Sequence, residues 1–291
     1  MNVAADGTGV AVVLAETAAR LAAAGCVSAE AEARWLLEEA LGASPGGLAF
    51  RHGESLPPAA AERLERMVAR RVAGEPLQYV IGWAPFGTLR VRVGPGVFVP
   101  RPETELVAER AAQHLRAARE GGSAPVAVDL CTGSAAIACF LAAEVPGARV
   151  YATEIDPGAL DWARRNVRAT RVELLAGDLD EPLPTDLEGE VDVLVANVPY
   201  VPAGAIPLLP RDVREHEPRL ALDGGPDGLD VLRRVVGGTR RWLAPGGWLV
   251  CEIGDDQGEA AAVLLAAAGL VEVGVRPDLT GRNRVLEGRR P

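Results

Sequence analysis

Aromatic side chains and positive charge are both scarce in this sequence. Phe, Trp and Tyr make up 4% of the 291 residues, and 40 Asp and Glu outnumber 30 Lys and Arg, which gives a formal net charge of -10 at pH 7. Broad binding of a phosphate backbone needs clustered positive charge. The balance therefore argues against broad binding of a phosphate backbone, and it leaves open a protein substrate with a basic surface.

Sequence signals for a metal site, for secretion and for a membrane span are also lacking. The cysteines are scattered, without a C-x-x-C pair, at Cys26, Cys131, Cys139 and Cys251. The histidines are equally scattered, at His52, His114 and His216. We therefore expect buried, reduced thiols and no bound metal. No basic segment precedes an apolar stretch at the N-terminus and no apolar run is long enough to span a bilayer, so we expect a soluble cytoplasmic protein.

The first part of the chain has the apolar periodicity of helices. Apolar residues recur at i, i+3, i+4 and i+7 from Val10 to Leu21, which predicts one buried helix face. A second helix is expected between an N-cap at Ser28 and a stop at Gly42, and a third between Pro57 and Gly74. The pattern predicts a small helical bundle in residues 1–80.

A segment of β character follows the predicted bundle. Residues Thr88–Val93 alternate polar and apolar side chains, Gly94-Pro95-Gly96 turns the chain, and Val97–Val99 is apolar again. This pattern predicts a β-hairpin in which the two apolar segments pair across the glycine turn. We expect it to form a linker over residues 81–99.

From residue 126 onwards, predicted strands alternate with helical segments. The expected strands are Val126–Leu130, Arg149–Thr153, Arg171–Leu175, Val191–Ala196, Trp248–Ile253, Val271–Val275 and Asn283–Gly288. Such alternation is typical of an α/β fold with a doubly wound, mostly parallel sheet. We expect this Rossmann-like domain to occupy residues 100–291.

Three successive predicted strands each end beside a carboxylate, at Asp129, Glu154 and Asp178. Gly133, in the turn after the first strand, lets the backbone approach a ligand, and an acidic residue after the second strand suits ribose hydroxyls. The turn lacks the full G-x-G-x-x-G pattern for a pyrophosphate, so S-adenosylmethionine fits better than a nicotinamide cofactor. The residues expected to bind it are Asp129, Cys131, Thr132, Gly133, Ser134, Ala135, Glu154, Asp178, Leu179 and Asn197.

A second motif, Asn197-Val198-Pro199-Tyr200, directly follows the apolar strand Val191–Ala196. An asparagine before a proline turn commonly has only a turn-forming role. Here the motif lies at the sheet edge where open α/β sheets bind ligands. Its amide, backbone carbonyls and ring suit the grip of a planar NH2 group held towards an electrophile. We therefore predict Asn197, Val198, Pro199 and Tyr200 as the catalytic residues.

Further segments carry a resemblance to a known family. They are Gly74–Tyr79, Phe98–Glu105, Glu217–Gly225, Asp227–Leu229 and Asp278–Arg282, beside Leu243–Gly247, which resembles a segment common to many methyltransferases. Together with the Asn-x-Pro-Tyr motif, they make nearly the whole chain resemble the HemK/PrmC-type protein N5-glutamine methyltransferases, which modify peptide-chain release factors.

The resemblance implies a class I methyltransferase fold and methyl transfer from S-adenosylmethionine to a glutamine amide in a Gly-Gly-Gln motif. The Asn197 side-chain oxygen and a backbone carbonyl would hold the amide nitrogen in line with the methyl group, and Tyr200 would pack against the amide. Because the nitrogen can lose its proton after it becomes cationic, no strong general base is needed. Arg101 and Glu103 would either contact the substrate or serve the start of a helix.

Three positions depart from the family pattern. Val198 replaces the first proline of the usual Asn-Pro-Pro-Tyr, and Cys131 and Ala135 stand where glycine is common. The valine keeps the backbone carbonyl and favours extended geometry before Pro199, whereas the other two add a Cβ near the ligand. Alternatives are therefore a methyltransferase for a ribosomal-protein glutamine or an adenine N6, or a non-catalytic adaptor for a translation factor. For the leading hypothesis we expect a monomer that binds a release factor and no nucleic acid directly.

Overall fold

The computed structural model describes residues 9–51, 53–119 and 124–291. The chain divides into two compact units, one formed by Met1–Gly82 together with Arg211–His216, the other by Trp83–Pro210 together with Glu217–Pro291. In the described part of the chain, no helix has the length and apolar character needed to cross a membrane.

The first unit is helical. Its helices are α1 (Val10–Ala23), α2 (Ala29–Leu41), α3 (Pro58–Val72), α4 (Leu77–Ile81) and α8 (Arg211–His216), with a 3-10 turn at Gly47–Phe50. The three helices predicted from the apolar periodicity are confirmed. Their buried faces include Leu21, Leu36 and Leu64.

The predicted ends of α2 have different outcomes. Gly42 terminates the helix in the left-handed conformation, with φ +60°, as expected for a glycine C-cap. Ser28 occupies the N-cap position, but its side chain makes no capping hydrogen bond.

Arg71 of α3 bonds to Glu32 of α2 at 2.6 Å and lies 3.8 Å from Asp212 of α8. This shared guanidinium connects three helices of the unit.

A β-hairpin is present, but the predicted pairing is wrong. Strand β1 (Trp83–Phe86) pairs with β2 (Leu89–Arg92), and Val97–Val99 lies outside any strand, with Val97 and Val99 buried. The turn is Gly87-Thr88, with Gly87 at φ +55°, because a glycine at the first position of a two-residue loop suits the twist of a hairpin. Pro85 makes β1 look unlike a strand, yet it is exposed in this short hairpin, where proline is tolerated.

Within the described residues, seven strands form the sheet of the second unit. They are β3 (Val126–Leu130), β4 (Arg149–Glu154), β5 (Glu173–Ala176), β6 (Val191–Ala196), β7 (Leu243–Glu252), β8 (Val271–Pro277) and β9 (Asn283–Arg289). Their order is β5-β4-β3-β6-β7-β9-β8, parallel from β5 to β7, with β9 antiparallel to both neighbours. The predicted strands and the doubly wound sheet are confirmed.

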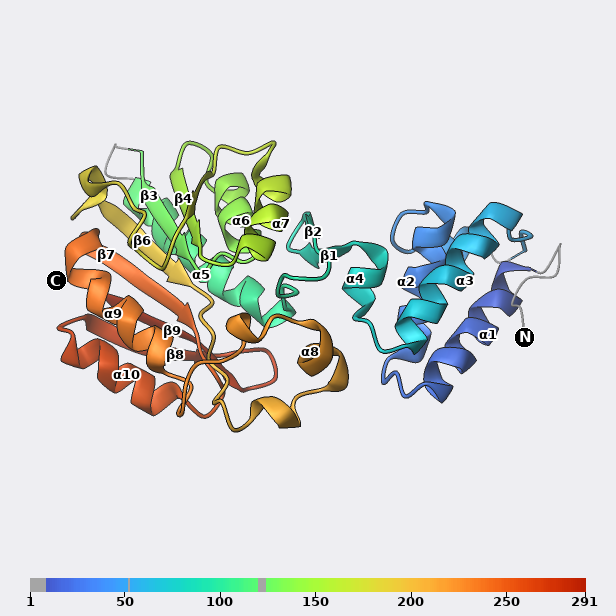
Figure 1. Cartoon of the computed structure of the whole chain (residues 1–291). Helices are drawn as coiled ribbons and strands as arrows, with labels where there is room; N and C mark the ends of the chain where they lie inside the picture. The colour runs from blue at the N-terminus through green and yellow to red at the C-terminus, as the bar shows by residue number, and fades with distance from the viewer. Residues whose placement is uncertain (1–8, 52, 120–123) are drawn as a thin grey trace. The chain divides into compact units, whose positions relative to one another are not determined.

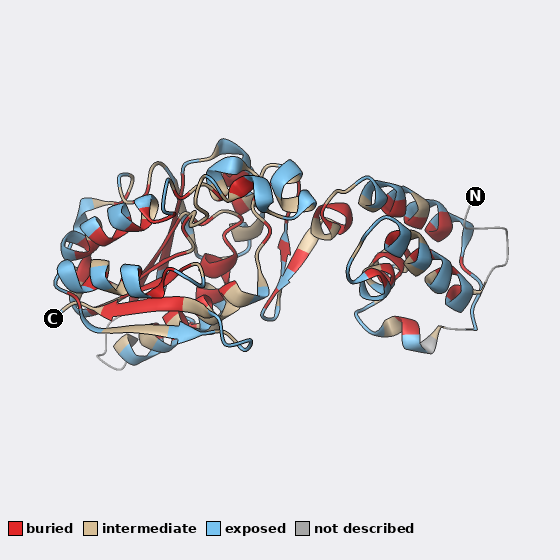
Figure 2. Cartoon of the chain, turned by 90° about the horizontal axis from the view of Figure 1, so that it is seen from below, coloured by how far each residue is buried: buried red, intermediate tan, exposed pale blue. Residues whose placement is uncertain are grey.

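Helices cover both faces of this sheet (Figure 1). Helices α5 (Pro102–Arg119), α6 (Ala136–Glu144) and α7 (Pro157–Val167) pack together on one side, and α9 (Asp230–Trp242) and α10 (Gly258–Ala267) cover the other. Short 3-10 turns lie at Thr185–Leu187, Ile206–Leu208 and Arg219–Ala221. The central strands are therefore buried on both faces, as Figure 2 shows.

The chain order reverses beside β3. From this strand the chain crosses to β4 on one side, and later returns to β6 on the other. The crevice at the carboxyl ends of such a pair of strands is the usual ligand site of open α/β sheets. The fold thus brings the residues after Leu130 and those after Ala196 to one crevice, because these two residues are register partners.

The cysteines are only partly as expected. Cys139 and Cys251 are buried, but Cys26 and Cys131 are partly exposed. Of the histidines, His52 lies outside the described residues. His114 stacks on Trp248 at a ring-centroid distance of 3.9 Å and bonds to Glu287 at 3.0 Å, which is a structural role on the sheet.

Candidate active site

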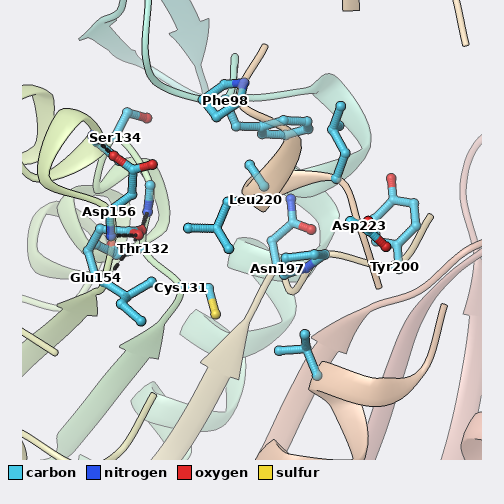
Figure 3. Close-up of a pocket in the computed structure, with 18 of the residues that line it drawn as sticks. Phe98, Cys131, Thr132, Ser134, Glu154, Asp156, Asn197, Tyr200, Leu220 and Asp223 are labelled. Atoms are coloured by element: carbon cyan, nitrogen blue, oxygen red, sulfur yellow. Dashed lines mark hydrogen bonds between the residues drawn. The ribbon is translucent and has the colours of Figure 1, made fainter. Parts of the chain in front are cut away.

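A cavity of about 350 Å³ opens at the carboxyl ends of β3, β4 and β6. The predicted site residues that line it are Cys131, Thr132, Gly133, Ser134, Glu154, Asp178, Leu179, Asn197, Pro199 and Tyr200. Figure 3 shows Thr132, Ser134, Glu154 and Asp156 on one side and Asn197, Tyr200 and Asp223 on the other. A ligand between these walls would therefore touch both predicted motifs.

Asp129 is a predicted residue that supports the cavity from behind, without lining it. It is 1% exposed, and its Oδ2 accepts hydrogen bonds from Thr132 Oγ1 at 2.6 Å and from the Ala138 N–H at 3.0 Å. Oδ1 has no hydrogen-bond partner among the described residues. Burial raises the pKa of Asp129 to about 7. Its visible role is to fix the turn that follows β3.

The turn after β3 has a backbone path that favours glycine at alternate positions. Cys131, Gly133 and Ala135 have φ values of +55°, +58° and +62°. A residue with a Cβ pays about 1–2 kcal/mol for this left-handed conformation. The two departures from the family pattern therefore leave the path intact at a conformational cost.

The side chains at these two departures have different surroundings. Cys131 lines the cavity, whereas Ala135 is fully buried and does not. Burial raises the pKa of the Cys131 thiol well above its usual range, so the thiol stays neutral. A change at position 131 thus alters the lining of the cavity, while one at position 135 acts on the turn alone.

Glu154 ties this turn to the end of β4. Its Oε2 accepts from the Gly133 N–H at 2.7 Å, and its Oε1 accepts from the N–H groups of Ile155 and Asp156 at 3.0 and 2.9 Å. Burial raises the pKa of this carboxyl, while the backbone bonds lower it. The carboxylate is thereby held in one orientation at the cavity wall, with lone pairs left for a ligand.

Other polar groups at this wall are also held in place. Asp156 caps α7 by accepting from the N–H groups of Gly158 at 2.6 Å and Ala159 at 3.2 Å. Asp178 accepts from Arg234 at 2.8 Å. The adjacent Leu179 is buried, with φ +47°.

This half of the cavity suits S-adenosylmethionine. The volume of the whole cavity lies within the usual range of small-molecule sites. Phe98, Ile137, Ile155 and Leu179 supply apolar surface for a purine, and Glu154 offers oriented acceptors for ribose hydroxyls. The acidic wall also suits a cationic sulfonium, and the neutral Cys131 thiol adds no charge to this wall.

A chain of hydrogen bonds orders the half of the cavity around Asn197. It runs through Thr104 and Glu252, which were not predicted as site residues. Asn197 Nδ2 donates to Thr104 Oγ1 at 3.3 Å, and Thr104 Oγ1 donates to Glu252 Oε2 at 2.6 Å. The Tyr200 hydroxyl donates to Glu252 Oε1 at 3.1 Å. A buried carboxylate on β7 thus connects both ends of the Asn-x-Pro-Tyr motif.

The backbone of the motif is held separately, by Gln257 and two glycines. Gln257 Nε2 donates to the carbonyl oxygens of Tyr200 at 2.9 Å and Asp227 at 3.3 Å. A Cβ added to Gly224 would lie 2.7 Å from the Pro199 oxygen, and one added to Gly228 would lie 2.2 Å from the Tyr200 oxygen. Only glycine permits this close approach.

Val198, the third departure from the family pattern, does not line the cavity. It is 2% exposed and belongs to the hydrophobic core beneath the sheet edge. An apolar side chain of moderate size therefore satisfies this position without being proline.

The segment after α8 closes another wall that the sequence did not assign to the site. Leu220, Leu222 and Asp223 line the cavity, and the Val201 N–H donates to the Leu222 carbonyl at 2.9 Å. Arg101 pairs with Glu217. The Arg101 guanidinium also lies 4.9 Å from the ring centroid of Phe98, so its side chain is engaged within the protein.

Comparison with known proteins agrees with this geometry. Residues 13–82 match the family described as PrmC N-terminal domain, and residues 127–215 match the family described as methyltransferase domain. A methyltransferase structure from Pyrococcus furiosus aligns with a TM-score of 0.52 and 18% identity, covering 79% of this chain and 98% of that chain. The structural likeness shows the fold.

Relatives with high sequence identity show the family. The release factor glutamine methyltransferase of Moorella thermoacetica is 47% identical over 277 residues, which cover 93% of this chain and 95% of the relative. The protein of the same name from Streptomyces coelicolor is 42% identical over 279 residues, 95% of this chain and 96% of the relative. The chain therefore belongs to the release factor glutamine methyltransferase family, whose methyl donor is S-adenosylmethionine.

Proposed function

We propose that this methyltransferase transfers a methyl group from S-adenosylmethionine to the side-chain amide nitrogen of a protein glutamine, in the Gly-Gly-Gln motif of peptide-chain release factors. The names of its relatives support this substrate. The sequence-predicted residues Asn197, Val198, Pro199 and Tyr200 form the acceptor site in this proposal. The cofactor site in this proposal is formed by Asp129, Cys131, Thr132, Gly133, Ser134, Ala135, Glu154, Asp178, Leu179 and Asn197.

The observation that carries the proposal is the state of the Asn197 carboxamide. Its nitrogen is engaged by Thr104, while its oxygen has no hydrogen-bond partner in the described part of the chain. The residue lines the cavity opposite the cofactor turn. An oxygen in this place accepts an N–H from an NH2 group, which a glutamine supplies and a glutamate does not.

The residues then contribute mainly by positioning. Bound S-adenosylmethionine would supply an electrophilic methyl group, and as the new bond to nitrogen forms, the electron pair of the broken bond between sulfur and methyl would stay on the sulfur of S-adenosylhomocysteine, the leaving group. Asn197 Oδ1 and a backbone carbonyl of the motif accept the two amide hydrogens, and so orient the nitrogen lone pair. Tyr200 presents its ring to the flat amide. The nitrogen becomes acidic once it is alkylated and releases its proton to these acceptors or to water.

We also propose that the release factor is the protein partner and that different segments of the chain have different roles. The helical residues 1–80 would dock the release factor, residues 81–99 would connect them to residues 100–291, and the latter would carry out the chemistry. The enzyme would act as a monomer in the cytoplasm, where translation takes place. It would not bind nucleic acid directly.

Methyl transfer to purified release factors tests the proposal. The enzyme and isotope-labelled S-adenosylmethionine are incubated with a Gly-Gly-Gln factor, with the same factor carrying Gly-Gly-Glu, and with ribosomal proteins and RNA. Labelling of the Gly-Gly-Gln factor alone is expected. Absence of labelling by enzyme that binds the cofactor, or preferential labelling of RNA or a ribosomal protein, contradicts the proposed substrate.

A further inference from the structure

A buried carboxylate lies next to Asn197-Val198-Pro199-Tyr200, here called the acceptor motif because it would bind the methyl-accepting amide. This carboxylate is not used in the chemistry described above. Glu252, at the end of β7, is fully buried, and each of its oxygens accepts a hydrogen bond from a different hydroxyl, that of Thr104 or of Tyr200. A buried carboxylate is costly unless such bonds satisfy it. Its position next to both ends of the motif indicates a task in the acceptor site.

The chain of donors fixes which way the Asn197 carboxamide faces. A threonine hydroxyl has one proton, and that of Thr104 is given to Glu252 at 2.6 Å. Thr104 Oγ1 can therefore only accept from Asn197, and it accepts from Nδ2 at 3.3 Å. An amide turned by 180° would place its oxygen against a hydroxyl oxygen that has no proton to offer.

We infer that Thr104 and Glu252 are positioning residues that hold the Asn197 side-chain oxygen towards the substrate, and that they thereby determine the selection of a glutamine amide over a glutamate carboxylate. This inference rests on the proposed function. With the oxygen presented, the NH2 of glutamine forms a hydrogen bond, while a glutamate oxygen meets another acceptor. With the amide turned, Nδ2 is presented and the preference is reversed.

Only an ionised carboxylate at position 252 enforces this arrangement. It accepts from both hydroxyls at once, whereas a protonated carboxyl or a glutamine must donate at one end. The hydroxyl that accepts from this donor, either that of Thr104 or that of Tyr200, no longer has to point its own proton at residue 252. Burial raises the pKa of Glu252 to about 7, so the constraint is expected to form as the pH rises through neutrality.

The charged groups that act on Glu252 lie on two other elements, helix α5 and strand β9. Besides the hydroxyls of Thr104 and Tyr200, Glu103 on α5 raises the pKa of Glu252 and Arg284 on β9 lowers it. Arg284 also donates to the Ile253 carbonyl at 3.4 Å. These two groups partly offset one another, and burial remains the largest cause.

The decisive variants are Thr104→Val, which removes the hydroxyl but keeps the shape, and Thr104→Ser, which keeps the hydroxyl. Turnover is measured with a Gly-Gly-Gln release factor, and inhibition with the Gly-Gly-Glu factor as a competitor. For Thr104→Val we expect kcat to fall about 10- to 100-fold. Inhibition by the Gly-Gly-Glu factor should strengthen about 10-fold, as for one gained hydrogen bond. Thr104→Ser should restore most of both properties.

A second variant, Glu252→Gln, keeps the size of the side chain and tests the role of ionisation. The kcat of the unaltered enzyme should rise with pH through an inflection near neutrality, and Glu252→Gln should lack that inflection. Binding of S-adenosylmethionine, followed by calorimetry, should be unchanged in each folded variant, because neither residue is assigned to the cofactor.

The outcomes separate this inference from the proposed function. If the unaltered enzyme fails to methylate the Gly-Gly-Gln factor, the proposed function fails. If it does methylate the factor, but Thr104→Val or Glu252→Gln keeps the original kcat and the original discrimination against Gly-Gly-Glu, the inference is overturned. A loss of kcat in both Thr104 variants, with discrimination unchanged, also overturns it, since that pattern indicates a packing role alone.

Discussion

The cofactor turn and the acceptor motif lie on opposite sides of one cavity, yet they achieve their shapes differently. The turn at residues 131–135 has three left-handed residues, of which two, Cys131 and Ala135, are not glycine, and it bonds to carboxylates at the ends of its own and the neighbouring strand. The acceptor motif at residues 197–200 depends on outside support from Thr104, Glu252 and Gln257. The turn therefore tolerates new side chains at a conformational cost, while the motif depends on the atoms that surround it.

Removal of the Asn197 carboxamide should break the acceptor side most completely. For Asn197→Ala we expect a loss of about 100- to 1,000-fold in kcat, as for removal of one preorganised hydrogen-bonding group. Because the other cofactor residues are unaffected, the affinity for S-adenosylmethionine should fall much less than kcat does. Turnover and calorimetry measured on the same preparation check both statements, and comparable losses of turnover and affinity would show that the two sides are not separable.

The next largest effect is expected at Gly228, one of the two glycines that closely approach carbonyl oxygens of the motif. An added Cβ at Gly228 would lie 2.2 Å from the Tyr200 oxygen, and the residue has φ +77°. Gly228→Ala should therefore lower the free energy of unfolding by about 2–4 kcal/mol and reduce turnover.

A matched control for this prediction is Gly281→Ala. Gly281 has φ +84°, but nothing lies within 4 Å of its added Cβ, so the cost should be about 1 kcal/mol, without loss of turnover. Denaturant unfolding measures both variants. Equal effects would show that the close approach to the motif has no energetic consequence.

The buried Glu252 should make stability and activity respond to pH in opposite directions. Burial raises its pKa from 4.5 to about 7 in the folded state, so the unfolded chain ionises first as the pH rises. The contribution of this group to stability should fall between pH 4.5 and pH 7 and stay constant above pH 7. Denaturant unfolding of the enzyme and of Glu252→Gln across this range measures the difference, and a difference independent of pH would contradict the burial argument.

The smallest effects are expected in the cofactor turn. Ala135→Gly removes the left-handed strain but also a buried methyl group, so stability should change by less than about 1 kcal/mol. Cofactor affinity should stay within about 2-fold, because Ala135 does not line the cavity. Cys131→Gly changes the lining, and should change the affinity more than Ala135→Gly does. Calorimetric titration with S-adenosylmethionine distinguishes the two, and the reverse order would contradict the comparison.

The sequence predicts much of the fold because the strands of the sheet are apolar and separated by clear helical segments. The bounds of Val126–Leu130 and Val191–Ala196 were predicted as they occur. The hairpin partner was missed because two glycine-containing turn signals compete, at Gly87 and at Gly94–Gly96, and local pattern does not decide between them.

The site was predictable where its residues share a local motif, as Asn197 and Tyr200 do, or where they end predicted parallel strands, as Glu154 does. Glu252 and Gln257 reach the motif through sheet order and helix packing. A carboxylate at the end of the strand Trp248–Ile253 was visible in the sequence. Its link to Thr104 depends on where α5 packs, which the sequence does not specify.

Localisation of the methyl group on the substrate tests the central claim most directly. The enzyme and Asn197→Ala, both shown to bind S-adenosylmethionine, are incubated with a Gly-Gly-Gln release factor, and the product is fragmented in a mass spectrometer. The account predicts one added methyl group on the side chain of that glutamine, formed by the unaltered enzyme and nearly absent with Asn197→Ala. A methyl group on another residue, or equal methylation by both proteins, would contradict it.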